Sequence, residues 1–140
     1  MIMLGRATIV MASALLPVPL AGAAAQEVRP DREQRVQFAR GASSATVRGR
    51  IRGYELHDYL VNAREGQRMT VQFGARGRFT YFIVRAPGAE ENLFDGTGNE
   101  PARLTLPASG NYRIRVYQMR NAARRGESSD YSLTIRVDAR

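Results

Sequence analysis

Apolar residues recur at every second position in short blocks along most of the chain after residue 33. Glycine, proline, asparagine and serine separate the blocks, whereas the three-or-four-residue spacing of helices is scarce. The first block is Val36 with Phe38. In the second block one parity carries Ala45, Val47 and Ile51, and the other carries Arg48, Arg50 and Arg52. This pattern predicts strands with one buried face and one cationic face.

The third and fourth blocks are separated by the short segment 64–67, Arg-Glu-Gly-Gln. The third holds Tyr59, Val61 and Ala63, and the fourth holds Met69, Val71 and Phe73. A short turn between two alternating blocks is typical of a β-hairpin, so we expect these strands to pair. The fifth block, 79–84, is apolar on both parities, which favours a central strand covered on both faces.

The second half of the chain continues the pattern after a turn-rich segment. Residues 86–103 are rich in proline, glycine, asparagine and acids, and only Leu93-Phe94 predicts a short edge strand there. Leu104 and Leu106 predict a brief strand before the turn 109–111. The remaining inward positions are Tyr112, Ile114 and Val116, then Tyr131, Leu133, Ile135 and Val137. The fold class is therefore all-β, an antiparallel β-sandwich of about eight short strands, with a barrel as second choice.

The first 25 residues have the composition of an export signal. Arg6 is their single charged residue, an apolar stretch follows from residue 7 to residue 20, and Ala23 and Ala25 match the A-x-A cleavage preference. The apolar stretch is shorter than the roughly 20 residues of a membrane span. We expect a signal peptide over 1–25 that is cleaved after Ala25 rather than a retained anchor. Export followed by a soluble life without stable membrane insertion is the expected outcome.

The mature chain is expected to form one domain. Residues 26–34 are polar and include a proline, so they predict a flexible N-terminal lead-in. Residues 35–140 are long enough for a single β-sandwich domain with one core.

Charge and composition restrict the chemistry. All 21 basic residues are arginines, and loss of Arg6 with the signal lowers the net charge from +8 to +7. The excess of arginine is explained either by the nucleotide composition of the genome or by a binding role. Only local clustering of arginines is therefore informative about binding. The absence of cysteine excludes disulfides and thiolate metal sites, and the single histidine excludes most zinc geometries and most Ser-His or Cys-His catalytic arrangements. We expect neither an enzyme nor a cofactor or metal site.

Two apparent sites have simpler interpretations. His57 lies between Glu55 and Asp58, but neighbours in a strand point to opposite faces, so a surface position on a strand is favoured over catalysis. The acidic run 89–96 does not match the EF-hand spacing. It predicts a solvated, turn-forming loop rather than a calcium loop.

The run 106–127 joins a tight turn, a strand and a loop loaded with Arg120, Arg124 and Arg125. Guanidinium groups suit a recessed acidic site because they offer planar, permanently charged donors. Export argues against nucleic acid as the partner. Arg113 and Arg115 predict a solvated sheet face. Four tyrosines provide aromatic surface that could stack on sugars or bases, but half-buried packing is the favoured interpretation. They are Tyr54, Tyr59, Tyr112 and Tyr117.

Several segments, taken in order, resemble the periplasmic inhibitors of goose-type (g-type) lysozyme. They are Phe38–Ala45, Ile51–Tyr54, Asp58-Tyr59, Gly66-Gln67, Leu106–Tyr112, Arg120–Arg124 and Tyr131. The likeness spans residues 38–137 and departs most at 86–102. It implies an antiparallel sandwich of about eight strands that inserts loops into the cleft of a muramidase and so protects peptidoglycan.

The resemblance also implies which residues touch the enzyme. Carried over position by position, the partner-binding residues are Tyr54, Ser109, Arg120 and Arg124, with Tyr59 and Arg125 as further candidates. The alternative is a non-catalytic exported β-sandwich module that binds polysaccharide or protein, similar to the domains appended to secreted peptidases. A homodimer formed through an exposed strand edge also stays open.

Overall fold

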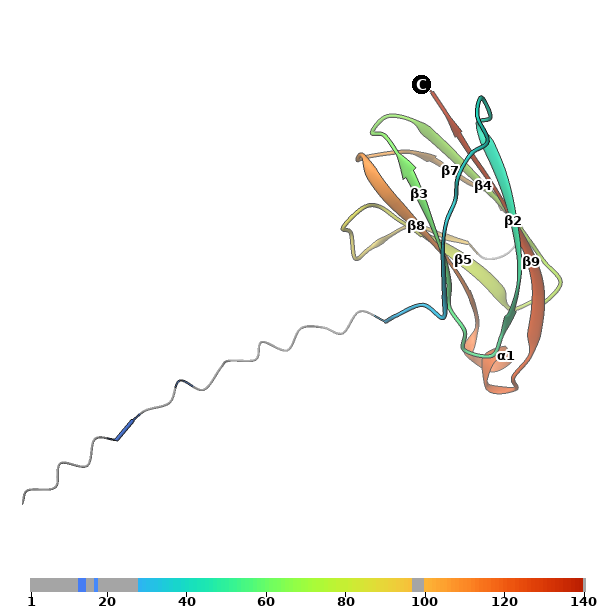
Figure 1. The fold of residues 1–140 in the computed structure, drawn as a ribbon. Helices are drawn as coiled ribbons and strands as arrows, with labels where there is room; N and C mark the ends of the chain where they lie inside the picture. Colours follow the sequence, from blue (N-terminus) through green and yellow to red (C-terminus); the bar gives the residue numbers. More distant parts are fainter. Residues whose placement is uncertain (1–12, 15–16, 18–27, 97–99, 140) are drawn as a thin grey trace, which may run out of the picture.

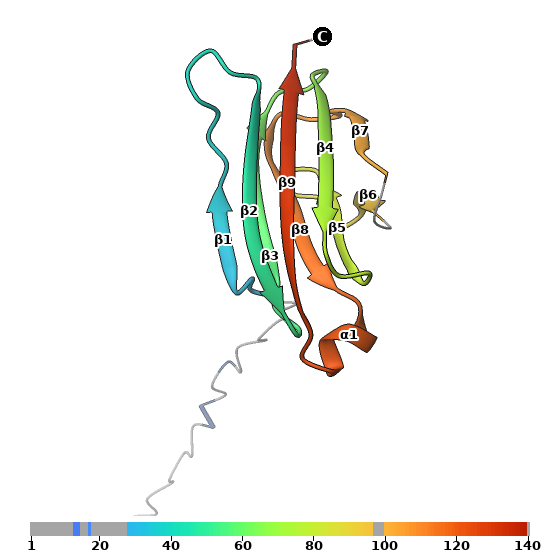
Figure 2. The same ribbon diagram turned by 90° about the vertical axis from the view of Figure 1, so that its right-hand side faces the viewer.

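The computed structural model describes residues 13–14, 17, 28–96 and 100–139. Figures 1 and 2 show two sheets that face each other, with one short helix at one end. The five-stranded sheet has the order β1 (Arg32–Arg35), β3 (His57–Ala63), β8 (Gly110–Gln118), β5 (Thr80–Arg85), β6 (Asn92–Gly96). The four-stranded sheet has the order β2 (Ser44–Arg52), β9 (Ser128–Asp138), β4 (Arg68–Ala75), β7 (Ala102–Thr105). The helix is α1 (Arg120–Arg124).

The predicted all-β antiparallel sandwich is confirmed, with nine strands in the described residues instead of about eight. Inward side chains follow the predicted parity. In β8, Tyr112, Ile114 and Val116 are fully buried, and in β9, Leu133 and Ile135 are fully buried. Alternate positions point to opposite faces, so these residues of the two sheets meet in one core.

The expected hairpin between the third and fourth blocks is wrong. β3 pairs with β1 and β8, whereas β4 pairs with β7 and β9, so residues 64–67 carry the chain from one sheet to the other. The Gly66 N–H donates to the Leu106 carbonyl (2.8 Å), and the Leu106 N–H donates to the Gln67 carbonyl (2.9 Å). The segment before β8 therefore provides hydrogen-bond partners for the backbone of this turn. Alternation predicts which face is buried but not which strand is the neighbour.

The structured region begins earlier than the predicted boundary at residue 35. β1 starts at Arg32 and pairs in parallel with β3, although none of its side chains is buried. Backbone bonds from Asp31 to Leu56 and from Val36 to Leu60, both 2.9 Å, continue this attachment. Backbone hydrogen bonds alone attach this polar segment to the sheet. Because no apolar pattern marks it, residues 32–34 were predicted to belong to a flexible lead-in.

The signal predicted over 1–25 lies outside the described residues except for positions 13, 14 and 17, and the cleavage site lies outside them as well. Within the part of the chain that the structure describes, no helix has the length and apolar character needed to cross a membrane.

The fifth block forms an interior strand, as predicted. β5 lies between β8 and β6; Phe82 and Val84 are fully buried in the core, and Ile83 is buried on the opposite face. Leu93-Phe94 lies in β6, which is the predicted edge strand.

Candidate functional site

The arginine-rich segment after β8 is a one-turn helix and not an extended loop. Ala122 and Ala123 are buried, so the turn packs its small residues inward and leaves Arg120 and Arg124 exposed. Gly126, at a φ of 66°, ends the helix. The N–H groups of Gly126 and Glu127 donate to the carbonyls of Ala123 (3.0 Å) and Ala122 (3.2 Å). This Schellman arrangement requires a residue that adopts positive φ without strain.

The turn between β2 and β3 is fixed to the chain that leaves α1. The Gly53 N–H donates to the Glu127 carbonyl at 2.9 Å. The buried Gln118 side chain donates through Nε2 to the carbonyls of Glu127 (2.7 Å) and Gly53 (3.3 Å). Tyr54, next in this turn, is 63% exposed. Figures 1 and 2 place the β2–β3 turn and α1 at the same end of the sandwich.

We call this region the α1 end and define it by Tyr54, Met119, Arg120, Arg124 and Arg125. Within the described chain, neither Arg120 nor Arg124 forms an ion pair or side-chain hydrogen bond. Arg125 differs because its Nε lies 2.9 Å from Glu127 Oε1. Met119 is 47% exposed and adds apolar surface that the sequence analysis missed, since a single methionine carries no pattern. The α1 end thus offers two unpaired guanidinium groups and an exposed aromatic ring at the same end of the sandwich.

Ser109 is not brought together with these arginines. It precedes β8, whereas α1 follows β8, and the nine residues of that strand separate the two by roughly 26 Å. Ser109 Oγ accepts a hydrogen bond from the Glu65 N–H at 2.9 Å. Nearby, the Tyr112 hydroxyl donates to the Ala108 carbonyl at 2.6 Å. The Ser-Gly-x-Tyr segment therefore stabilises the turns at the opposite end.

Tyr59 is also removed from the candidate surface. Its side chain is fully buried, and its hydroxyl lies 2.6 Å from the hydroxyl of Tyr131. The other tyrosines divide as packing predicts: Tyr112 is fully buried and Tyr117 is half-buried. Only Tyr54 presents its ring to solvent at the α1 end.

The surface position predicted for His57 is wrong. His57 is buried because it shares the inward parity of β3 with Tyr59. Its Nδ1 lies 2.7 Å from the Tyr131 hydroxyl, and its Nε2 lies 2.9 Å from Glu55 Oε2. Burial, assisted by the hydrogen bond to Tyr59, raises the pKa of Tyr131 well above its ordinary value. His57 Nδ1 and the hydroxyls of Tyr131 and Tyr59 satisfy one another inside the core, while His57 Nε2 faces the partly exposed Glu55.

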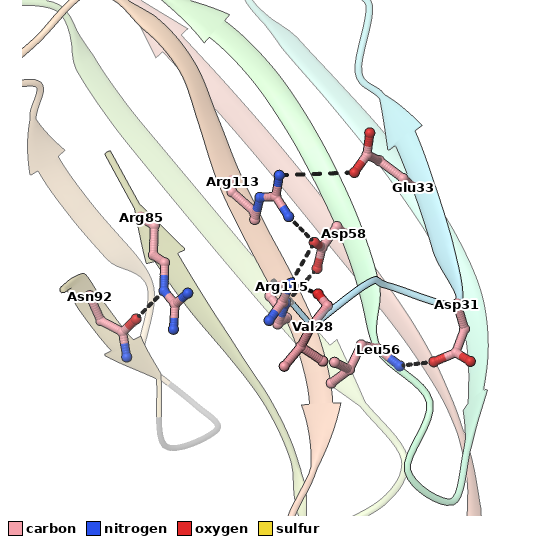
Figure 3. A network of polar contacts seen from close by, with 9 residues as sticks. All are labelled: Val28, Asp31, Glu33, Leu56, Asp58, Arg85, Asn92, Arg113 and Arg115. Atoms are coloured by element: carbon pink, nitrogen blue, oxygen red, sulfur yellow. Dashed lines mark hydrogen bonds and ion pairs between the residues drawn. The ribbon is translucent and has the colours of Figure 1, made fainter. Parts of the chain in front are cut away.

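A second polar cluster lies on the outer face of the five-stranded sheet (Figure 3). The Asp58 carboxylate is fully buried and accepts bonds from Arg113 Nη1 (2.8 Å) and from Arg115 Nε (2.7 Å) and Nη2 (2.9 Å). Arg115 Nη2 also donates to the Val28 carbonyl at 3.4 Å. The solvated face predicted for these arginines is therefore wrong, because register places Asp58 of β3 directly opposite Arg115 of β8.

The turn-rich segment around β6 contributes no comparable cluster. Glu90 and Glu91 are exposed, and Asn92 Oδ1 accepts a hydrogen bond from Arg85 Nε at 2.8 Å. In the ranges the structure describes, no three histidine, cysteine or acidic side chains are grouped to hold a metal ion.

Comparison with known proteins places this geometry in a family. No family model matches the chain. The inhibitor of g-type lysozyme from Escherichia coli (strain K12) is 33% identical over 106 residues, which cover 73% of this chain and 78% of that protein. The crystal structure of Aeromonas hydrophila PliG, a periplasmic inhibitor of g-type lysozyme, matches with a TM-score of 0.72 and 41% identity over 76% of this chain and 96% of that one.

A third similarity concerns the fold alone. The pre-peptidase C-terminal domain of Bacillus anthracis collagenase matches with a TM-score of 0.57 at 16% identity, over 80% of this chain and 100% of that one. Sequence identity above 30% is confined to the inhibitors among these three proteins. The chain belongs to the family of g-type lysozyme inhibitors.

Proposed function

We propose that this protein inhibits g-type lysozyme by placing the α1 end in the acidic cleft of the enzyme. The observation that carries the proposal is the pair Arg120 and Arg124, which are exposed, have no ionic partner in the described chain and stand on a helix closed by Gly126.

The chemistry of the partner suits these groups. Glycoside hydrolysis depends on a carboxylic acid that protonates the glycosidic oxygen, together with a second acidic group or a positioned water. A guanidinium group offers paired donors to a carboxylate, so an inserted arginine occupies the charge that catalysis requires. Truncation of a hydrogen-bonded arginine in a desolvated interface costs about 2–5 kcal/mol.

The framework of the α1 end favours tight binding. Gln118 connects the β2–β3 turn to Glu127, and buried Ala122 and Ala123 fix the helix on the sandwich. Little backbone freedom is then lost when the partner binds, so more of the contact energy contributes to affinity. Tyr54 adds a rigid aromatic contact with few rotatable bonds.

The candidates outside the arginine pair have different roles in this proposal. Arg125 contributes less than Arg120 or Arg124 because it already pairs with Glu127. Ser109 acts in folding, since its hydroxyl holds the Glu65 N–H at the far end of β8.

Location in the periplasm is supported by PliG from Aeromonas hydrophila, which is periplasmic. The composition of residues 1–25 adds the proposal that this segment is a signal peptide removed after Ala25. Mass spectrometry of the exported protein then yields a chain that begins at Gln26. A retained segment 1–25 would contradict this part.

The decisive experiment is lysis of purified cell walls by a g-type lysozyme in the presence of residues 26–140. The parent protein suppresses lysis at near-stoichiometric ratios. Arg120→Ala and Arg124→Ala each raise the concentration needed by about 30-fold or more, the equivalent of at least about 2 kcal/mol. Their melting temperatures stay near that of the parent because both side chains are exposed.

Arg64→Ala is the matched control. It removes one exposed arginine from the β3–β4 turn, at the end of the sandwich opposite α1. We expect less than about threefold loss of inhibition, which reflects the change in net charge alone. If Arg120→Ala and Arg124→Ala inhibit as well as Arg64→Ala does, the α1 end is not the inhibitory surface.

A further inference from the structure

The outer face of the four-stranded sheet carries a regular set of charges that inhibition at the α1 end does not use. Six arginines point outward from its strands: Arg48, Arg50, Arg52, Arg68, Arg103 and Arg136. The acidic groups among the outward positions of these strands are Asp130 and Asp138, and Asp138 pairs with Arg136 at 3.0 Å. The broad face of this sheet is therefore cationic.

The charges on β2 form a row. Arg48, Arg50 and Arg52 occupy alternate positions of this edge strand, so they project from one face at intervals of about 7 Å. None of the three forms an ion pair with another described residue. Such a row is suited to a partner that carries repeated negative charges along its length.

A hollow lies beside this row because β4 carries a glycine at an outward position. Gly74 pairs with Ser132 of β9, which in turn pairs with Arg48 of β2. Two adjoining hollows, about 340 and about 430 Å³ in volume, both include Gly74 and Ser132. Gln72 and Thr134 line the first, while Arg48 and Arg76 line the second. Asp130 also lines the second hollow, so two arginines and one aspartate are the charged residues around this depression, together with hydroxyl and amide groups.

The chemistry of this face selects among polyanions. On its four strands, all of which the structure describes, the outward positions hold only serine, threonine, glutamine, glycine, arginine and aspartate. These positions therefore lack the aromatic stacking surfaces typical of single-stranded nucleic acid sites and the apolar side chains by which amphipathic segments insert into membranes. Hydroxyl and amide groups match the hydroxyls of sugars, and arginines match carboxylates.

We propose that this face binds the carboxylate-bearing glycan of the bacterial cell wall, with the Gly74–Ser132 hollow at its centre. The occupant follows from the charge and hydrogen-bonding groups of the face and from the periplasmic relatives, whose compartment contains that glycan. Because α1 lies at one end of the sandwich and this face on its broad side, the molecule binds the wall with the α1 end still accessible. The proposal does not depend on inhibition of lysozyme.

Cosedimentation of residues 26–140 with purified peptidoglycan sacculi, without lysozyme, tests the proposal. The test variant carries Arg48→Gln, Arg50→Gln and Arg76→Gln. The matched control carries Arg35→Gln, Arg40→Gln and Arg64→Gln, which lie outside this sheet and change the net charge equally. At low salt we expect the Kd for sacculi to rise about tenfold in the test variant and less than about threefold in the control.

Both triple variants keep the melting temperature of the parent, and both inhibit g-type lysozyme as the parent does if the α1 end is the inhibitory surface. Equal loss of sedimentation in the two variants overturns the proposal, since retention then depends on net charge alone. Failure of the parent to sediment also overturns it. Stronger retention on duplex DNA or on anionic phospholipid vesicles than on sacculi at the same salt rejects the glycan as the occupant.

Discussion

Replacement of Asp58 by asparagine tests whether the outer polar cluster stabilises the fold. The carboxylate is fully buried and accepts three hydrogen bonds of 2.7–2.9 Å from two guanidinium groups. Asp58→Asn keeps the shape of the side chain but removes the charge. It leaves Arg115, whose side chain is only 12% exposed, without its anion in a poorly hydrated position.

The expected cost follows from these contacts. Removing one partner of a buried ion pair typically costs about 3–5 kcal/mol because the remaining charge stays desolvated. The Arg113 side chain is 32% exposed and regains water, so the lower end of the range, about 3 kcal/mol, applies. For a domain of this size, that loss corresponds to a fall of roughly 12 °C in Tm.

Thermal and urea unfolding of residues 26–140, followed by circular dichroism, measure this cost. Asp138→Asn is the control, because it removes a carboxylate that pairs with Arg136 at 3.0 Å on the exposed surface. Its expected cost is at most about 1 kcal/mol. The double variant Asp58→Asn with Arg115→Gln is expected to lose less than the sum of the single variants.

The reasoning is refuted if Asp58→Asn unfolds within about 2 °C of the parent. A loss of stability equal to that of Asp138→Asn also refutes it, because the buried ion pair would then contribute no more than the exposed one. Inhibition of lysozyme by folded Asp58→Asn stays at the parent level because Asp58 lies outside the α1 end.

Two further predictions concern buried or turn-forming hydroxyl groups. The raised pKa of Tyr131 keeps its hydroxyl protonated in the folded state, whereas the unfolded side chain ionises near 10.0. The free energy of unfolding therefore falls as pH rises above about 10, by up to about 1.4 kcal/mol per pH unit for this group. Urea unfolding across this range measures the slope, which Tyr131→Phe reduces; equal slopes in both proteins would contradict it. Ser109→Ala removes the acceptor of the Glu65 N–H and lowers stability by about 1 kcal/mol, measured by Tm, while inhibition stays within about threefold of the parent. A tenfold loss of inhibition with an unchanged Tm would instead indicate that Ser109 contacts the lysozyme.

Local pattern predicted the faces of the strands better than their neighbours. The parity of β2 and β8 could be derived from alternation because a polar side chain on the core side is costly. The pairing of β3 was misassigned because pairing depends on long-range register, which the short turn 64–67 does not encode. β1 was missed for the opposite reason, since backbone bonds attach it without any apolar signal.

The candidate site was predicted in part. The arginine cluster was visible as a bunching of like charges, but a five-residue helix is too short for periodicity to distinguish from a loop. Ser109 and Arg120 are close in sequence, yet an extended strand separates them in space. His57 was predicted at the surface, and the ion pairs of Asp58 were not predicted, because Tyr131 and Arg115 come from strands distant in sequence.

The arginine row on β2 has a consequence for self-association. β2 is an edge strand, so its free backbone groups would accept the same strand of a second copy. Antiparallel addition centred on Arg50 would set that side chain against its own counterpart and Arg48 against Arg52 of the other molecule. Like charges in directly opposed positions destabilise such a ladder, and this edge is thereby protected from sheet extension and aggregation.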